Sequence, residues 1–431
     1  MSGIPMRMVV LSVAARGDAF RLRRRGAQRL PPGRRVPGVP ARLRRAPLRC
    51  EARGERGHVS GSPGEPIRNN GTHVPIDALL PARHLLCAHE RGASRLPRCR
   101  IGNGYRMRLG LLDVGSAAAH LEVVDLDRSR LPRASWSHKA RTRLAENTAP
   151  DGVVTARGFE QAECAVRECV RAARAEVPDV LVAYGTSAVR DAVNGVELRK
   201  RLGDVAGVRI GVLTPRDEAA LTYHAAWRWH GRAGATMTTV DIGGGTSDVA
   251  TGDGPYPDDV VSLPFGAARL TRQYLPDDPP GPEQVEELVS AIRGAVRRSL
   301  RHLAGTELGH PVALSKVLRQ LAVLTESSGA RAVRHPDRLA RASLESWIPK
   351  LASLSQAERA KLPGVSRTRA RRILAGAVVA EVILDAIGIE QLEICPWGLR
   401  EGMVFRFAEA CERAGGVSGE ALHAASAEIF T

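Results

Sequence analysis

Residues 238–250 read Thr-Thr-Val-Asp-Ile-Gly-Gly-Gly-Thr-Ser-Asp-Val-Ala, two apolar runs separated by three glycines. Such runs on either side of a glycine cluster predict a strand, a tight turn and a returning strand. Because glycines carry no side chain, consecutive backbone N–H groups can converge on an anion and a phosphate can approach them. Gly243, Gly244 and Gly245 therefore form a candidate phosphate-binding loop, with a plain glycine-rich hairpin as the alternative.

Two carboxylates flank the glycines. Asp241 stands before the loop and Asp248 after it. Hard oxygen ligands beside a phosphate are where Mg²⁺ is usually held in proteins. The spacing therefore favours a phosphate site with a divalent cation, Mg²⁺ or Mn²⁺, over a purely structural hairpin.

A similar unit occurs earlier in the chain. Residues 109–115, Leu-Gly-Leu-Leu-Asp-Val-Gly, read as a buried strand ending in a turn, and residues 120–125 as the returning strand. Asp241 follows Asp113 by 128 residues, the length of one small domain. A strand–turn–strand unit that recurs at domain spacing suggests two similar α/β domains facing one another.

The segments between and after the two units support an α/β fold. Helical and strand patterns alternate from residue 158 to residue 230, as in α/β domains. We expect helices at 158–176, near 189–203 and at 216–230, with strands at 180–184 and 208–212. After residue 264 we expect helices at 281–304, 315–326, 343–355, 367–387 and 398–413, interrupted by one short strand at 391–395. The predicted domains are 107–235 and 236–412, followed by a tail at 413–431.

The first 106 residues have a different composition. They hold 22 Arg, no Lys and 6 acidic residues, whereas the remainder holds 41 basic and 40 acidic residues. Without a helical or strand period, this segment cannot bury enough apolar surface to offset its ordering entropy, so we expect disorder. It reads as a basic tail, as an Arg-rich targeting peptide or, as we favour, as the product of a start codon assigned too early, with Met107 the true start.

The overall net charge of +17 therefore says little about the rest of the chain, and we expect no specific nucleic-acid partner. The seven cysteines form no Cys-x-x-Cys pair and no disulfide framework. No apolar run approaches the roughly 18 residues of a membrane span. We therefore expect a cytoplasmic protein without a membrane partner.

The two hairpins resemble the paired phosphate loops of the actin-like superfamily, which includes sugar kinases, actin, heat-shock chaperones and the Ppx/GppA phosphatases. Five further collinear segments resemble the Ppx/GppA exopolyphosphatase and guanosine pentaphosphate phosphatase family, in the style of its short actinobacterial members. They are 186–192 (Thr-Ser-Ala-Val-Arg-Asp-Ala), 217–222 (Asp-Glu-Ala-Ala-Leu-Thr), 262–271 (Ser-Leu-Pro-Phe-Gly-Ala-Ala-Arg-Leu-Thr), 314–316 (Leu-Ser-Lys) and 393–402 (Glu-Ile-Cys-Pro-Trp-Gly-Leu-Arg-Glu-Gly).

The resemblance implies two ribonuclease H-like domains, as in actin, around a cleft, and a role for each matched residue. Glu218 would be the catalytic base, and Arg190 would grip phosphate oxygens. On spacing alone, Glu218 could equally be an acid that favours the start of a helix. The remaining matched residues would bind phosphate (Ser116, Gly243, Gly244, Gly245, Thr246 and Arg269) or metal (Asp113, Asp241 and Asp248).

The chain departs from the family pattern in both hairpins. Family members usually follow the first Asp-x-Gly-Ser with Asn and then Ser or Thr, whereas Ala117, Ala118 and Ala119 follow Ser116 here. Losing one such donor costs on the order of 1.5–3 kcal/mol at a charged site. At position 248, Asp replaces the usual Glu, so a metal could be held through water. Lys139 and Arg143 could line an anion channel or could be surface charges.

These features lead to three hypotheses. The first is a metal-dependent phosphohydrolase that removes the terminal phosphate of inorganic polyphosphate or of guanosine pentaphosphate. The second, motivated by the alanines after Ser116, is a catalytically weakened sensor of polyphosphate or an alarmone. The third, an actin-like ATPase or chaperone, rests on the Gly-Gly-Gly-Thr-Ser-Asp sequence. The family resemblance is also compatible with a homodimer.

Overall fold

The computed structural model describes residues 106–127, 130–231, 235–326 and 337–413, together with residues 426, 429 and 430. Apart from Arg106, the predicted disordered extension lies outside the described residues. The predicted tail also lies outside them, apart from residues 413, 426, 429 and 430.

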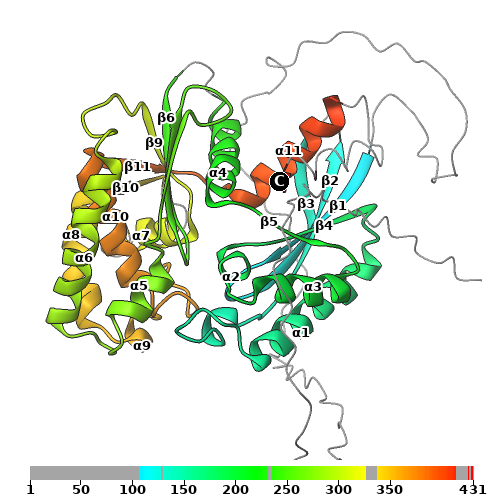
Figure 1. The fold of residues 1–431 in the computed structure, drawn as a ribbon. Helices are drawn as coiled ribbons and strands as arrows, with labels where there is room; N and C mark the ends of the chain where they lie inside the picture. Colours follow the sequence, from blue (N-terminus) through cyan, green and yellow to red (C-terminus); the bar gives the residue numbers. More distant parts are fainter. Residues whose placement is uncertain are drawn as a thin grey trace, which may run out of the picture. The chain divides into compact units, whose positions relative to one another are not determined.

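The first half of the described chain builds a five-stranded sheet in the order β3-β2-β1-β4-β5 (Figure 1). The first three strands pair antiparallel, and β4 and β5 join them in parallel. The elements are β1 (Arg106–Val114), β2 (Ala119–Asp127), β3 (Arg130–Ala140), the 3-10 helix η2 (Leu144–Glu146), α1 (Ala156–Ala172), the 3-10 helix η3 (Ala173–Ala175), β4 (Val180–Gly185), α2 (Ser187–Arg190), α3 (Gly195–Ala206), β5 (Ile210–Val212) and α4 (Pro215–His230).

Helices cover both faces of this sheet. Leu112 and Val114 of β1 point to one face and pack with α1 and α3. Leu109 and Leu111 point to the other face, because successive side chains of a strand alternate, and pack with Phe407 of α11 (Leu399–Arg413). Helix α11 therefore returns to the first sheet, although nearly all of it belongs to the predicted second domain in the sequence.

The second half builds a six-stranded sheet in the order β10-β11-β9-β6-β7-β8. Its parallel and antiparallel pairs place β6 at the centre, between β7 and β9. The elements are β6 (Met237–Ile242), β7 (Ser247–Gly252), β8 (Asp259–Leu263), α5 (Ala267–Tyr274), α6 (Pro282–Leu300), β9 (His310–Ala313), α7 (Lys316–Glu326), β10 (Arg338–Ala340), α8 (Arg341–Ser353), α9 (Gln356–Arg359), α10 (Ile373–Ile387), β11 (Gln391–Ile394) and α11.

A large apolar cluster fills one face of the second sheet. It includes residues of α5, α6, α7, α8 and α10, helices that lie together beside this sheet (Figure 1). Helix α10 is buried along nearly its whole length. The opposite face packs against α4, whose Tyr223 and Ala226 meet Met237 of β6 and Val312 of β9. Helix α4 thus begins near the first sheet and lies against the second.

The structure confirms an α/β fold with two sheets, and corrects the predicted elements in several places. The prediction lacked β3, β8, α5 and α9, and the helix expected at 367–387 begins only at Ile373. The helix expected near 189–203 is two helices, because the chain bends after Arg190 and a Cβ at Gly195 would lie 2.5 Å from the carbonyl oxygen of Val189. Among the described residues after 264, there are two strands besides β11, namely β9 and β10. Both are only three or four residues long, too short for a periodic signal, and their pairing with neighbouring strands defines them.

None of the helices in the described ranges is both long enough and apolar enough to cross a membrane. Cys169, Cys395 and Cys411 are buried free thiols.

Candidate active site

The glycine loop between β6 and β7 is backed by the start of α5. The carbonyl oxygens of Gly244 and Gly245 accept hydrogen bonds from the backbone N–H groups of Ala268 and Gly266, each at 3.1 Å. Gly266 must be glycine, because a Cβ there would lie 2.4 Å from backbone atoms of the loop. Within the described ranges, the N–H groups of Gly244 and Gly245 donate to no backbone carbonyl. They are therefore available to an anion, as the sequence predicts.

The loop of the first hairpin faces this one. A Cβ placed on Gly244 would lie 3.7 Å from Oγ of Ser116 and 3.9 Å from a guanidinium nitrogen of Arg372. Both loops line a hollow of about 150 Å³, together with residues of α2 and α5. Its lining includes Ser116, Ser187, Asp191, Gly244, Gly245 and Arg269. The tertiary structure thus brings four of the predicted phosphate-binding residues to one small space.

Three aspartates lie at the ends of the strands that carry these loops. Asp241 and Asp248 are cross-strand neighbours on β6 and β7, and Asp113 is near the end of β1. Burial raises the pKa of Asp241 to about 7, and the pKa values of Asp113 and Asp248 to about 6. Asp248 raises the pKa of Asp241 further, because two negative charges share a poorly solvated region.

Glu218 lies in the first turn of α4. Its neighbour Asp217 closes the capping box with Thr214, accepting hydrogen bonds from the Thr214 N–H at 3.3 Å and hydroxyl at 2.5 Å. Asp217, and not Glu218, therefore caps the helix, and the Glu218 side chain is only 13% exposed. Burial raises the pKa of Glu218 to about 8; Arg190 opposes this shift, and Asp248, Asp113 and Asp241 add to it.

Arg190 holds Glu218. One guanidinium nitrogen of Arg190 donates to Oε1 of Glu218 at 2.7 Å and to the carbonyl oxygen of Leu213 at 3.0 Å. Its Nε donates to Asp191 at 2.8 Å. The side chains of Arg190 and Glu218 are each only 13% exposed, so their ion pair is largely shielded from solvent.

Two other predicted phosphate ligands have carboxylate neighbours in the structure. The hydroxyl of Thr246 lies 3.4 Å from Oδ2 of Asp248, and Ser262 donates to the other oxygen of the same carboxylate. Arg269 lies 3.8 Å from Asp191, with which it lines the hollow. These contacts leave Thr246 beside a predicted metal ligand and Arg269 at the wall of the hollow.

The burial and charge of these carboxylates suit a divalent cation, but their spacing does not suit direct ligation by all three. Oδ1 of Asp113 is buried without a hydrogen-bond partner, and the clustered carboxylates raise one another's pKa, so a cation would relieve both costs. However, no three of these carboxylates are close enough to share one ion directly: among the described residues, the only group of three potential ligands with all their atoms within 4.8 Å lies elsewhere. An ion that keeps several of its waters, as Mg²⁺ does, matches this spacing.

Sequence reasoning offered Lys139 as a possible lining of an anion channel, but missed the cluster of cations to which it belongs. Burial lowers the pKa of Lys316 to about 8 and that of Arg369 to about 10, and neighbouring cations lower both further. The pKa of Lys139 is also lowered, first by burial and then by Arg369 and Arg400. The cluster comprises Lys139, Lys316, Arg319, Arg369, Arg372 and Arg400. A signal in the sequence was Lys316 in the Leu-Ser-Lys segment; Arg369 and Arg372 carry none, because they follow α9 in an irregular stretch.

Solved structures with a similar fold identify the fold class of this chain. A Ppx/GppA family member from Aquifex aeolicus matches with a TM-score of 0.60 and 23% identity, over 73% of this chain and 100% of that chain. An exopolyphosphatase from Cytophaga hutchinsonii matches with a TM-score of 0.62 and 18% identity, over 70% of this chain and 98% of that chain. The fold is therefore the two-domain actin-like fold expected from the sequence.

Sequence comparisons identify the family within this fold class. The family model described as "Ppx/GppA phosphatase family" matches residues 124–410. Exopolyphosphatase 1 of Mycobacterium tuberculosis is 41% identical over 306 residues, which is 70% of this chain and 88% of that protein. Exopolyphosphatase 1 of Mycobacterium leprae is 40% identical over 309 residues, or 70% of this chain and 89% of that protein. The chain belongs to the Ppx/GppA phosphatase family, as the resemblance of its motifs predicted.

Proposed function

We propose that this protein removes the terminal phosphate from inorganic polyphosphate, with Glu218 accepting a proton from the attacking water. The observation that carries the proposal is a buried Glu218 carboxylate with a raised pKa, in the field of three aspartates that flank two phosphate-type loops. The relatives named exopolyphosphatase 1, at 40–41% identity, support polyphosphate as the substrate.

The environment of Glu218 suits a general base. A pKa of about 8 makes this carboxylate a much stronger base than an ordinary glutamate, at a value near the working pH. Arg190 fixes one carboxylate oxygen at 2.7 Å, and we assign the other oxygen to proton transfer.

The loops and the cation cluster suit a polyanion. The N–H groups of Gly244 and Gly245 and the hydroxyl of Ser116 would bind oxygens of the terminal phosphate, with Arg269 at the edge of the hollow. The cluster around Lys316 and Arg369 would bind the phosphates that follow. Cations that lower one another's pKa gain from a ligand with many negative charges, which favours a chain of phosphates over a single nucleotide.

Asp113, Asp241 and Asp248 are the residues that would hold a divalent cation, Mg²⁺ or Mn²⁺. When bound, such an ion neutralises charge on the phosphoryl oxygens. Asp248 is shorter than the usual glutamate, and the three carboxylates are too far apart for joint direct ligation. We therefore assign them to the cation's waters as well as to the cation itself.

Two other candidates follow from specific residues. Guanosine pentaphosphate shares the terminal phosphoanhydride and would use the same base. A sensor that binds polyphosphate without hydrolysing it is favoured by Ala117 and Ala118, which offer no side-chain donor where family members carry Asn and Ser or Thr.

Phosphate release from long-chain polyphosphate tests the proposal. Purified full-length protein with Mg²⁺ should release orthophosphate, and Glu218→Gln should lower kcat about 10³-fold while polyphosphate binding changes less than threefold. Asp217→Asn is the matched control, because it changes the adjacent carboxylate and retains a capping side chain; its kcat should stay within threefold. Equal turnover in Glu218→Gln would exclude the assigned base.

The wild-type protein separates the other candidates. Tight calorimetric binding of polyphosphate without any phosphate release would favour the sensor. Faster release of phosphate from guanosine pentaphosphate than from polyphosphate would favour guanosine pentaphosphate as the substrate. The predicted domain boundary near residue 235, the cytoplasmic location and the homodimer stay predictions.

A further inference from the structure

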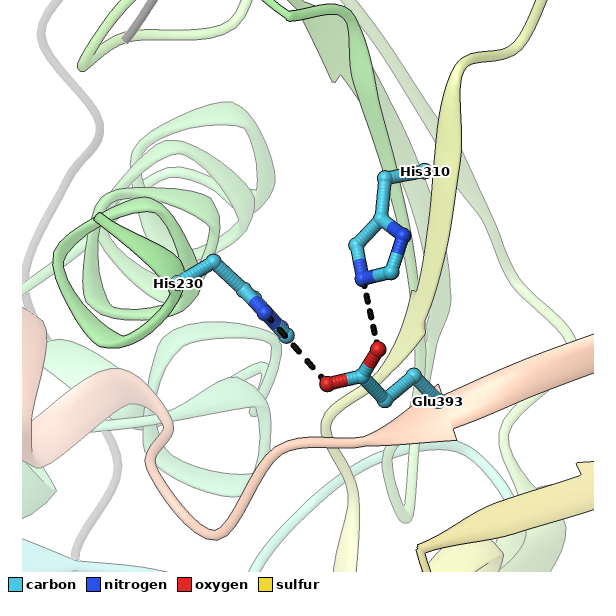
Figure 2. A group of neighbouring side chains, drawn as sticks. All are labelled: His230, His310 and Glu393. Atoms are coloured by element: carbon cyan, nitrogen blue, oxygen red, sulfur yellow. Dashed lines mark ion pairs between the residues drawn. The ribbon is translucent and has the colours of Figure 1, made fainter. Parts of the chain in front are cut away.

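A group of three metal-binding side chains lies away from the carboxylates of the active site. His230, His310 and Glu393 come from α4, β9 and β11 and point toward one another (Figure 2). Their ligand atoms all lie within 4.8 Å of one another. Oε1 of Glu393 is 3.5 Å from Nδ1 of His230, and Oε2 is 2.8 Å from Nε2 of His310. Both imidazoles thus converge on one carboxylate.

The backbone holds two of these residues in place. Gly231 ends α4 in the left-handed conformation and donates to the carbonyl oxygen of Trp227, which fixes the last turn at His230. The N–H of His310 donates to the carbonyl oxygen of Thr236 at 2.8 Å. Gly309 beside it has φ +59°, and a Cβ there would lie 1.9 Å from that same oxygen, so this close approach requires glycine.

The position of His230 is unusual for a structural residue. It continues the face of α4 on which Tyr223, Ala226 and Trp227 pack against the second sheet, and its side chain is only 6% exposed. An apolar residue would extend this packing without the cost of burying an imidazole. The alternative is a hydrogen-bonded His–Glu–His network that needs no ion, and the experiment below separates the two.

The donor set selects the kind of ion. Two imidazole nitrogens and one carboxylate suit Zn²⁺ and similar borderline cations, whereas Mg²⁺ prefers oxygen alone. Ligand atoms around a tetrahedral Zn²⁺ lie roughly 3–3.5 Å apart, given bond lengths of about 2.0–2.2 Å. The distances of 2.8 and 3.5 Å are close to that range, and all three ligand atoms lie within 4.8 Å of one another, so small side-chain movements would bring them toward tetrahedral spacing. The negative end of the α4 dipole at His230 also favours a cation.

We propose that His230, His310 and Glu393 form a second metal site, for Zn²⁺ or a similar borderline divalent cation, separate from the carboxylates of the active site. Twelve residues of α4 separate His230 from Glu218, which is about 18 Å along the helix. A metal bound here ties the end of α4 to β9 and β11 of the second sheet. Its role is to hold the helix that carries Glu218, and the site stands independently of the proposed catalytic function.

Metal titration of the intact protein tests this site. Metal-stripped full-length protein, with Mg²⁺ in excess to occupy oxygen sites, is titrated with Zn²⁺ by calorimetry. His310→Ala and Glu393→Gln should each weaken the tightest Zn²⁺ binding at least 100-fold. Zn²⁺ should raise the thermal unfolding midpoint of the wild-type protein by several degrees and leave that of the variants unchanged.

A matched control is available in the same chain. His302 forms an exposed pair with Asp259, with Nε2 2.6 Å from Oδ2, and lacks a second histidine. His302→Ala should leave Zn²⁺ affinity unchanged. Equal affinity of wild-type protein and His310→Ala, or no tight Zn²⁺ binding by the wild type, would overturn the proposal.

Co²⁺ gives a readout that does not depend on comparing variants. Bound to two histidines and a carboxylate, Co²⁺ should show the visible d–d bands of low-coordinate cobalt without a thiolate charge-transfer band. A thiolate band would place the ion on cysteines and would contradict the site. Circular dichroism of each variant checks that loss of binding is not loss of folding.

Discussion

The two hairpins that face each other at the active site share a backbone and differ in their side chains. In the first, the N–H of Gly115 donates to the carbonyl oxygen of Ala118 at 3.0 Å; in the second, Gly243 donates to Thr246 at 2.8 Å. The same four-residue loop thus closes both hairpins, residues 115–118 in the first and 243–246 in the second. The strand registers also correspond, since Asp113 lies opposite His120 and Asp241 opposite Asp248.

The side chains give these equivalent positions different chemistry. The second hairpin pairs two carboxylates, which raises the pKa of Asp241 beyond the effect of burial. In the first, the partner of Asp113 is a histidine whose pKa burial and Arg400 lower to about 4, so it is neutral and contacts Arg400. Negative charge for a cation is therefore concentrated on the second hairpin. A repeated backbone supplies two loops, but only one of them carries a complete set of polar groups.

The largest expected effect comes from a substitution that disrupts the second loop, Gly266→Ala. In Gly266→Ala, the new Cβ would meet backbone atoms of the loop at 2.4 Å, and neither segment can move without losing hydrogen bonds. We expect a loss of about 2 kcal/mol or more in the free energy of unfolding, as for severe overpacking. Phosphate release from polyphosphate should fall at least 100-fold, measured beside urea unfolding.

The first hairpin offers the control for that variant. In Gly115→Ala, the Cβ would lie 3.3 Å from the carbonyl oxygen of Ala118, a tight contact that a small shift relieves. Activity should stay within about fivefold and stability within about 1 kcal/mol. Similar losses of activity and stability in both variants would mean that the contact with the start of α5 does not distinguish the second loop from the first.

Adding polar side chains to the first hairpin tests whether their absence limits activity. Ala117 is exposed and Ala118 half-buried at the tip of the first hairpin, so larger polar side chains fit there. The double variant Ala117→Asn/Ala118→Ser restores the donors that the family pattern carries. If the donors bind substrate, kcat/KM for polyphosphate should rise about 10-fold, equivalent to about 1.4 kcal/mol. An unchanged kcat/KM would show that Ser116 and the backbone suffice.

The smallest expected effect is a pH dependence of stability. Glu218 has a pKa of about 8 in the folded protein and an ordinary value of 4.5. Between these values the folded state keeps a proton that the unfolded chain has released, so the stability of the metal-free protein falls as the pH rises. In the presence of a metal chelator, the midpoint of thermal unfolding should be several degrees lower at pH 8 than at pH 5.5.

Two comparisons isolate the carboxylate contribution to that fall. Glu218→Gln removes the titrating group, so its midpoint should change less between the two pH values. Excess Mg²⁺ should raise the wild-type midpoint at pH 8 more than at pH 5.5, because cation and proton compete for the same carboxylates. A fall of the same size in Glu218→Gln would assign the pH dependence to other groups.

Much of the site could be predicted from local sequence. The glycines, Asp113 and Asp241 belong to strand–turn–strand patterns that specify their own backbone, and Gly244, Gly245, Ser116 and Arg269 do line one hollow. The contact of Arg190 with Glu218 was not predicted. Their motifs are 28 residues apart, and only the packing of α2 beside the start of α4 brings them to 2.7 Å.

For other features, the sequence marked single residues at most and did not predict that they gather. The cation cluster draws Lys139 from β3, Lys316 from the start of α7 and Arg400 from α11, segments far apart in the sequence. The same holds for His230, His310 and Glu393, each of which is an unremarkable single residue in its own segment.

The sequence alone therefore determined the α/β class, the two phosphate-type hairpins and the family, because these rest on short-range periodicity and on glycines at defined positions. The tertiary structure decided which carboxylates lie together, which arginine holds Glu218, and where cations and imidazoles gather. Charge and burial depend on distances between segments that are remote in the chain, and only the folded backbone sets those distances.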